Sequence, residues 1–409
     1  MALRSFKNIG PGIIVAAAFI GPGTVTLCSI AGVNFGYALL WAVLLSTGAT
    51  IILQEMAARI GLVTQSGLAD VLRTQLKHSL WRKPVLMLIL SAIVIGNTAY
   101  QAGNLGGGVL GLTALFGPLN WTILGVEVNL TALVLGLIAY LVLSLNSDKI
   151  LTRILTLLVL FMSGSFVITA VLIQPKVTQV LSGLLIPSMP QESLWTIIGL
   201  IGTTIVPYNI FLHASLVRKK WQSVAALPEV KKDTYWTIGL GGLVSMSIVI
   251  CAAGSGITQI NNAVDLAEGL RPLYGSLAKG LMGLGLFAAG MTSAITAPLA
   301  AAYVASGCLG WPSGNQSQKF KLVWQTVLIV GVLLSATGIK PITIIQFAQV
   351  ANGTLIFIIA GLVLWIINKP ELMKQATNSL WQNILGGLVL LVTLMVGFKG
   401  ISGVIQILF

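Results

Sequence analysis

Apolar positions along the chain form long runs, separated by short segments that contain glycine, proline and charged residues. A helix needs about 20 apolar residues to cross the hydrocarbon core of a bilayer. The first run is too long for the apolar core of a cleavable signal peptide, so we interpret it as a first span. The pattern predicts eleven transmembrane helices, at residues 11–33, 37–58, 86–115, 128–146, 152–173, 194–217, 235–255, 276–306, 322–338, 341–367 and 380–397.

The composition supports this interpretation. Of the 409 residues, 56% are hydrophobic and 8% are charged, whereas about 25% of a soluble domain is charged. A water-soluble enzyme or nucleic-acid binder is therefore excluded, and we expect residues 1–409 to form a single transmembrane domain. The cysteines, Cys28, Cys251 and Cys308, lie in or at the ends of apolar runs, and we interpret them as small hydrophobic residues.

The basic residues indicate the orientation, because cytoplasmic loops carry an excess of Lys and Arg. A cytoplasmic N-terminus would place 18 basic residues inside: Arg4, Lys7, Arg59, Arg73, Lys77, Arg82, Lys83, Lys149, Arg153, Arg218, Lys219, Lys220, Lys231, Lys232, Lys319, Lys321, Lys369 and Lys374. Five would lie outside: Lys176, Arg271, Lys279, Lys340 and Lys399. We predict a multi-pass protein of a bacterial plasma membrane with its N-terminus cytoplasmic and its C-terminus external. Insertion accounts for the net charge of +13, so no nucleic-acid partner is expected, and no obligatory protein partner is evident.

Two predicted spans are interrupted near their middles. The first contains Gly21-Pro22-Gly23-Thr24 and the sixth contains Val206-Pro207-Tyr208-Asn209. Unwound backbone at membrane depth is tolerated only where protein or a water-filled cavity satisfies it. Two breaks five helices apart predict inverted five-helix repeats, at about 11–173 and 194–367, an extra helix at 380–397, and a binding site at the bilayer centre. Simple proline kinks are the alternative.

Three segments carry a family resemblance: residues 53–70, residues 207–215 and residues 288–296. They resemble the second helix with its following loop, the sixth helix and the eighth helix of the NRAMP family of divalent-metal transporters. The resemblance extends over most of the chain. It implies an all-α, LeuT-type fold with broken first and sixth helices, and secondary active transport.

The family's metal ligands are replaced in this chain. In metal-transporting members the first break reads Asp-Pro-Gly-Asn, and its Asp and Asn bind the metal. Gly21 and Thr24 stand at those two positions here. The sixth helix of the family usually reads Met-Pro-His-Asn, and Val206 and Tyr208 replace its Met and His. The resemblance therefore supports the fold more strongly than it supports metal as the substrate.

The proton pathway of the family is altered as well. Its acidic pair on the third helix aligns with Asn97 and Tyr100, or with Gln101 after a shift of one residue. Of the polar residues on the sixth helix, Asn209 and His213 remain. The polar residues of helix 3 recur at intervals of three and four and form one stripe, which either lines the pathway or makes interhelical hydrogen bonds. The pathway candidates are Asn97, Tyr100, Gln101, His213, Gln349 and Asn352.

The charge of the central site suggests its substrate. Hard divalent cations prefer oxygen ligands that include carboxylates, and neither break has one; Glu55 is expected to pair with Arg59, one turn further along the same helix. Half-helix N-termini near Thr24 and Asn209 would attract an anion instead. We therefore expect a small anion, such as bicarbonate, with a small amino acid in the same anion-recognising class. Mg²⁺ or Mn²⁺ is the alternative substrate. The expected binding residues are Gly21, Gly23, Thr24, Thr203, Val206, Tyr208 and Asn209.

Coupling is expected to involve helix 8, where Thr292 and Ser293 offer adjacent hydroxyls. In LeuT-type transporters this region holds a sodium ion, so Na⁺ symport is the hypothesis and packing by small polar residues is the alternative. Proton coupling has only His213 and Glu55 as candidates. No cofactor is expected, apart from this coupling ion. A non-transporting sensor also remains open, whereas an intramembrane enzyme ranks last because the spans hold no pair of nucleophile and base.

Overall fold

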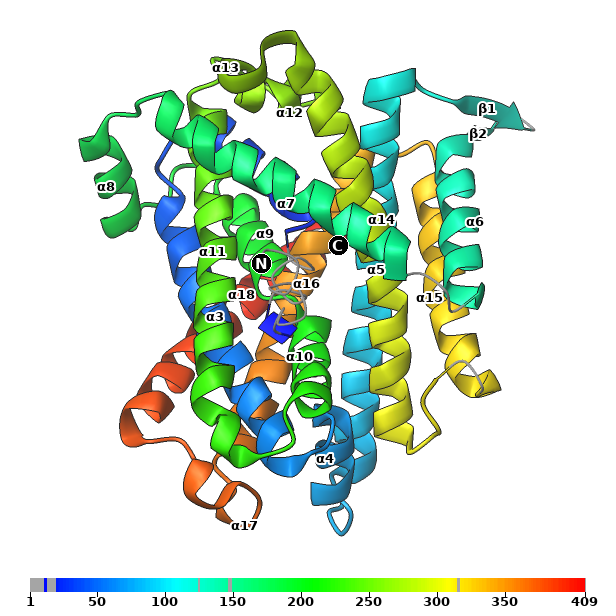
Figure 1. Cartoon of the computed structure of the whole chain (residues 1–409), viewed down its shortest axis with the longest axis vertical. Coiled ribbons are helices and arrows are strands. Elements are labelled where there is room, and N and C mark those ends of the chain that lie inside the picture. Colours follow the sequence, from blue (N-terminus) through cyan, green and yellow to red (C-terminus); the bar gives the residue numbers. More distant parts are fainter. Residues whose placement is uncertain (1–10, 13–19, 124–125, 146–148, 315–316, 409) are drawn as a thin grey trace, which may run out of the picture.

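The computed structural model describes residues 11–12, 20–123, 126–145, 149–314 and 317–408 (Figure 1). This part of the chain is mostly helical, because a segment surrounded by lipid must satisfy its backbone polar groups internally. The helices longer than one turn are α2 (Pro22–Phe35), α3 (Leu40–Thr64), α4 (Leu68–Gln75), α5 (Arg82–Phe116), α6 (Leu130–Leu145), α7 (Lys149–Leu172), α8 (Val177–Leu185), α9 (Leu194–Thr204), α10 (Pro207–Lys220), α11 (Leu227–Ala253), α12 (Ala263–Ala267), α14 (Ala278–Leu309), α15 (Gln318–Ala336), α16 (Pro341–Ile367) and α18 (Leu380–Leu408). Single turns, α13 (Arg271–Tyr274) and α17 (Pro370–Met373), lie in two of the loops.

Each predicted span coincides with a helix, but one of these helices is shorter than predicted and another is described only in part. Nine helical stretches of the described residues are long and apolar enough to cross a membrane, with α9 and α10 together making one of them. The first predicted span is represented by α2, since residues 13–19 lie outside the described residues. The fourth is α6, which has 16 residues and reaches about 24 Å at about 1.5 Å per residue.

Two features were not predicted. An antiparallel hairpin of β1 (Asn120–Ile123) and β2 (Val126–Asn129) interrupts the expected all-α structure between α5 and α6. It contains no apolar run, so a search for spans does not detect it. Arg59 was assigned to a cytoplasmic loop, and that assignment is wrong: α3 continues to Thr64, and Arg59 is only 2% exposed.

The most extensive packing in the described bundle joins α5 to α14. A Cβ atom added to Gly290 would lie 2.5 Å from the backbone nitrogen of Gly108 and 2.6 Å from the carbonyl oxygen of Asn104. On another face of α5, a Cβ atom at Gly107 would collide with the ring of Pro22. The glycine run at 106–108 therefore lets α5 approach α14 and the broken first span at once.

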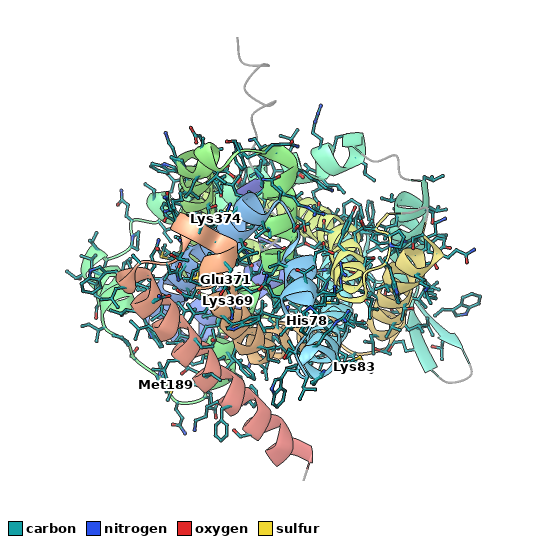
Figure 2. The ribbon with its side chains drawn as sticks, turned by 90° about the horizontal axis from the view of Figure 1, so that it is seen from below. His78, Lys83, Met189, Lys369, Glu371 and Lys374 are labelled. Atoms are coloured by element: carbon teal, nitrogen blue, oxygen red, sulfur yellow. The ribbon has the colours of Figure 1, made fainter. Side chains whose placement is uncertain are left out.

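The loops fall into two groups at opposite ends of the bundle (Figure 1). The turns after α3, α10 and α16 lie at the lower end, and α8, α12, α13 and the hairpin lie near the upper end. Figure 2 views the lower end directly, where His78, Lys83, Lys369 and Lys374 are presented. These three turns after α3, α10 and α16, all predicted to be cytoplasmic, thus share one end, which we call the basic end. The orientation of the termini in the membrane stays a prediction.

Candidate functional site

Both predicted breaks are present as helix starts deep in the bundle. Gly21 has an extended backbone, with φ −105° and ψ −174°, and α2 begins at Pro22. After α9 ends, Val206 is extended as well, and α10 begins at Pro207. Proline lacks the N–H that a helix interior needs, but its fixed φ suits the first helical position. Each proline therefore starts a new half-helix.

The two breaks are joined by a hydrogen bond between hydroxyls. Thr24 Oγ1 lies 2.9 Å from Thr203 Oγ1, and both residues are fully buried. Thr24 stands on the first turn of α2, whereas Thr203 is next to the last residue of α9. Residues 179 positions apart thus meet where both helices are interrupted, which is the arrangement expected of a central binding site.

Helix α16 covers this junction. A Cβ atom at Gly23 would lie 2.6 Å from Gln349 Cδ and would collide with Gln349 Nε2. A Cβ atom at Gly202 would collide with the carbonyl oxygen of Gln349. A side chain at Gly202 would therefore require a backbone shift, whereas one at Gly23 would displace the side-chain amide of Gln349, which packs directly against the first turn of α2.

Asn209 is the most distinctive residue of the second break. It is 1% exposed, and among the described residues neither its amide oxygen nor its amide nitrogen has a hydrogen-bond partner. Beside it, the ring of Tyr208 meets the ring of Tyr100 edge to face, with centroids 5.6 Å apart. The start of α10 thus combines an apolar contact to α5 with a free amide in the interior of the bundle.

Further buried polar atoms of the predicted site and pathway also lack partners within the part of the chain that the structure describes. An unpartnered buried polar atom costs free energy, about 1–3 kcal/mol, so a group of them in one protein indicates a site for a hydrophilic ligand. These atoms are Gln101 Oε1, Tyr208 Oη, Ser293 Oγ, Gln349 Oε1 and Asn352 Nδ2, and two neighbours on α2 and α5, Thr26 Oγ1 and Asn104 Nδ2, also lack partners.

No carboxylate stands in either broken span, at residues 11–33 or 194–217. The described residues likewise hold no group of three His, Cys, Asp or Glu side chains that could bind a metal. Glu55, the acid nearest the core, binds Arg59 through Oε2 and Nη2 at 2.9 Å, which confirms the expected ion pair. The donors at the breaks are therefore hydroxyls, amides and backbone N–H groups.

Two residues of the polar stripe on α5 bond to α14. Asn97 Nδ2 donates to the carbonyl of Ala297 at 2.9 Å, and Gln101 Nε2 donates to the carbonyl of Ala294 at 3.0 Å. Interhelical hydrogen bonding, one of the two interpretations left open for this stripe, is thus present. A role in the pathway remains a prediction for both residues. Asn352 of α16 also lies close to α5, at Gly96.

The candidate sodium residues on α14 differ in their contacts. Thr292 Oγ1 donates to the carbonyl of Ala288 at 2.8 Å. Ser293 Oγ is buried and has no partner among the described residues. A hydroxyl that donates within its helix still has lone pairs for a cation. Both oxygens thus keep the capacity to coordinate one.

His213 has a partner that sequence reasoning missed. Its Nδ1 lies 3.0 Å from Gln54 Oε1 of α3, and its Nε2 has no partner in the described part of the chain. Gln54 precedes Glu55 in an apolar span. A polar residue inside a membrane span is costly to bury and is therefore usually paired or functional. This rule could have identified Gln54 from the sequence.

Solved structures share this architecture. A mutant of the manganese transporter from Eremococcus coleocola matches with a TM-score of 0.75 and 19% identity, covering 96% of this chain and 86% of that one. The structure of MhsT in complex with L-phenylalanine matches with a TM-score of 0.62 and 14% identity, covering 96% and 97%. These likenesses show the fold: the chain has the LeuT-type transporter fold, as the family resemblance implied.

Sequence comparison defines the family. The family model described as "Natural resistance-associated macrophage protein-like" matches residues 12–402. The chain therefore belongs to the Nramp family, a family of multi-pass membrane transporters, and the predicted resemblance is confirmed. Two relatives are named divalent metal cation transporter MntH. The one from Yersinia enterocolitica is 26% identical over 401 residues, covering 94% of this chain and 92% of the relative. The one from Erwinia tasmaniensis is 26% identical over 402 residues, covering 95% and 92%. Such names agree with the expectation that the protein is not an enzyme.

Proposed function

We propose that this Nramp-family protein is a secondary active transporter whose substrate, a small anion such as bicarbonate, binds where α2 and the α9–α10 break meet. The observation that carries the proposal is the donor set at the breaks. Thr24, Thr203 and Asn209 supply neutral hydroxyl and amide groups, and neither broken span contains an acid. Half-helix N-termini add partial positive charge.

A divalent metal cation is the second candidate, and the comparisons favour it over the anion. The relatives from Yersinia and Erwinia are named divalent metal cation transporters, and a manganese transporter shares the fold. Mg²⁺ keeps much of its water shell, so carbonyls, hydroxyls and Asn209 could hold the hydrated ion. We place the anion first because specificity resides in the site rather than in the fold, and the ligands that a metal prefers are replaced here.

Sodium symport is proposed for the coupling. Thr292 and Ser293 lie on α14 with oxygen atoms able to accept a cation. The sodium ion would also reduce the cost of moving a single negative charge into the membrane.

The decisive experiment measures uptake into proteoliposomes of labelled bicarbonate and, in parallel, of Mn²⁺ and Mg²⁺, each with and without a sodium gradient. We expect bicarbonate uptake that needs sodium, and no metal uptake. Gly21→Asp should abolish bicarbonate uptake, because it places a negative charge at the start of α2. Gly21→Asn is the matched control, because it adds a side chain of the same size without the charge.

Several outcomes would contradict the proposal. Bicarbonate uptake that survives Gly21→Asp undiminished would place the anion elsewhere. Metal uptake alone, preserved or improved by Gly21→Asp, would establish the second candidate.

The sodium hypothesis has its own test. Replacing Thr292 and Ser293 together by Ala should raise the sodium concentration for half-maximal uptake. Thr296→Ala is the control, because Thr296 Oγ1 makes the same kind of bond to its own helix, 2.8 Å from the carbonyl of Thr292. An unchanged sodium dependence in the double variant would remove the pair from the ion site.

A further inference from the structure

A polar pocket lies between α4, α10 and α14, and α4 lies toward the basic end (Figure 1). Its lining includes Ser215 and Arg218 of α10 and Ser306 of α14. Six residues separate Asn209 from Ser215, which is about 9 Å along a helix. The pocket is therefore built on the helix that begins at the central break, further along it in the direction of the basic end.

Positive charge surrounds this pocket. Among the described residues, no carboxylate lies within ion-pair distance of Arg218, which is half-buried in the lining. Two aromatic residues of the lining carry cations over their rings: Lys219 Nζ is 5.4 Å from the ring centre of Tyr303, and Lys319 Nζ is 5.2 Å from that of Trp311. One cation, Arg218, thus lies in the lining, and two more, Lys219 and Lys319, lie over rings that belong to it.

The start of α4 faces the pocket as well. Residues 67–70 line it, and the helix begins after Gly67, which has no side chain to cap it. The first N–H groups of a helix have no partner within that helix, and they attract anions. Asp70 is the carboxylate of the described lining, and it stands in the first turn of α4, where it offsets part of the positive end of this helix. Its charge is weakened, because its side chain is 37% exposed and lies 3.5 Å from Arg73.

A hydroxyl in the lining is available for a ligand. Ser306 is 2% exposed, and its Oγ atom has no hydrogen-bond partner among the described residues. Across the pocket, Ser215 Oγ donates to the carbonyl of Phe211 at 3.1 Å and keeps its lone pairs. A buried donor, an unpaired guanidinium and an uncapped helix start thus converge on one cavity.

We infer that this pocket, which we call the α4–α10–α14 pocket, is an anion site through which the substrate leaves for the basic end of the protein, with Arg218 setting the charge preference. The inference rests on the proposed anion transport. It adds a specificity-determining residue outside the central site. Membrane insertion would explain basic residues anywhere at this end, but it does not require an unpaired arginine in the lining of a cavity.

The test titrates the purified full-length protein in detergent with sodium bicarbonate, at an ionic strength held constant with sodium gluconate. Trp311 reports binding, and the difference from Trp311→Phe isolates its fluorescence. We expect a saturable change. Arg218→Gln should raise the half-saturating concentration about tenfold, the equivalent of 1.4 kcal/mol, whereas Arg218→Lys should retain much of the affinity. Lys232→Gln is the matched control, because it removes one exposed positive charge outside the lining.

Asp70→Asn distinguishes an anion from a cation. It should lower the half-saturating concentration of bicarbonate, because it removes the opposing charge. Saturable Mn²⁺ or Mg²⁺ binding that Asp70→Asn abolishes would overturn the inference and make the pocket a cation site. Equal affinities for bicarbonate in the wild type, Arg218→Gln and Lys232→Gln would also overturn it.

Proteoliposome flux in the same variants separates this inference from the proposed function. Bicarbonate binding that depends on Arg218, without bicarbonate uptake by the wild type, would refute anion transport and leave the pocket as an anion site. Wild-type uptake of bicarbonate that Arg218→Gln leaves unchanged, together with unchanged binding, would refute the role of the pocket and leave the proposed function intact.

Discussion

The hydroxyl oxygens of Thr24 and Thr203 lie 2.9 Å apart and connect the first turn of α2 to the last turn of α9. We expect Thr203→Val to lower the free energy of unfolding by about 1 kcal/mol. Thr24→Val combined with Thr203→Val should cost less than the sum of the two single changes, because residues that share a contact are not additive. Thermal unfolding in detergent measures this. Thr204→Val is the control, since its hydroxyl donates within its own helix, to the carbonyl of Leu200.

The contact between Gly23 and Gln349 gives a second prediction. Gly23→Ala should impair uptake strongly, because the new methyl group would overlap the side-chain amide of Gln349. Shortening the neighbour should relieve the overlap, so Gly23→Ala with Gln349→Ala should fold better than Gly23→Ala alone. Thermal unfolding of both variants tests this. Equal stability of Gly23→Ala and the wild type would show that the Gln349 side chain on α16 moves aside for the new methyl group.

Asn209 and Asn97 should respond in opposite ways to replacement by leucine. Asn209→Leu should abolish uptake while leaving the unfolding temperature unchanged or higher, since neither polar atom of its amide has a partner in the described structure. Asn97→Leu should lower the stability by about 1 kcal/mol, because it removes the bond to Ala297. Uptake and thermal unfolding of the two variants make the comparison. Equal losses of stability would indicate that Asn209 serves packing alone.

The buried ion pair of Glu55 and Arg59 should matter far more than an exposed one. Arg59 also donates to the carbonyls of Ala376 and Thr377 at 3.1 and 3.3 Å, so Arg59→Gln leaves the buried carboxylate of Glu55 and two partly buried carbonyls without their charged donor. We expect a loss of about 3–5 kcal/mol. Arg271→Gln breaks a pair in which the arginine is 69% exposed and should cost under about 1 kcal/mol. Denaturation of both variants tests the contrast.

Local features of the sequence predicted the breaks, whereas the contacts between distant helices could not be predicted. Pro22 and Pro207 lack the N–H that a helix interior needs and suit the first position of a helix, so the positions of both half-helices followed from the sequence. Thr24 and Thr203 were each site candidates, yet nothing in either segment indicates that their hydroxyls meet. That contact depends on how two helices 179 residues apart are packed.

The assignment of Arg59 to a loop was wrong because it relied on charge alone. Arg59 was assigned to a loop because an arginine interrupts the apolar run, and a hydropathy pattern contains no information about its partners. In the structure the charge is balanced by Glu55 and by carbonyls from the segment before α18. The predicted pairing with Glu55 was correct. We did not infer from this pairing that α3 continues past Glu55 and Arg59.

The interlocked glycines of α5 and α14 bear on how the protein moves. These are the third helices of the two predicted repeats, and their backbones touch at Gly290 and Gly108 with no side chain between them. No side chains lie between the two helices here that could rearrange during a sliding movement. Sliding of one helix along the other would also break the hydrogen bonds from Asn97 and Gln101. We therefore expect α5 and α14 to stay together as one rigid unit during transport. Opening of the site toward either side of the membrane would then require the half-helices α2 and α10 to rotate relative to this unit.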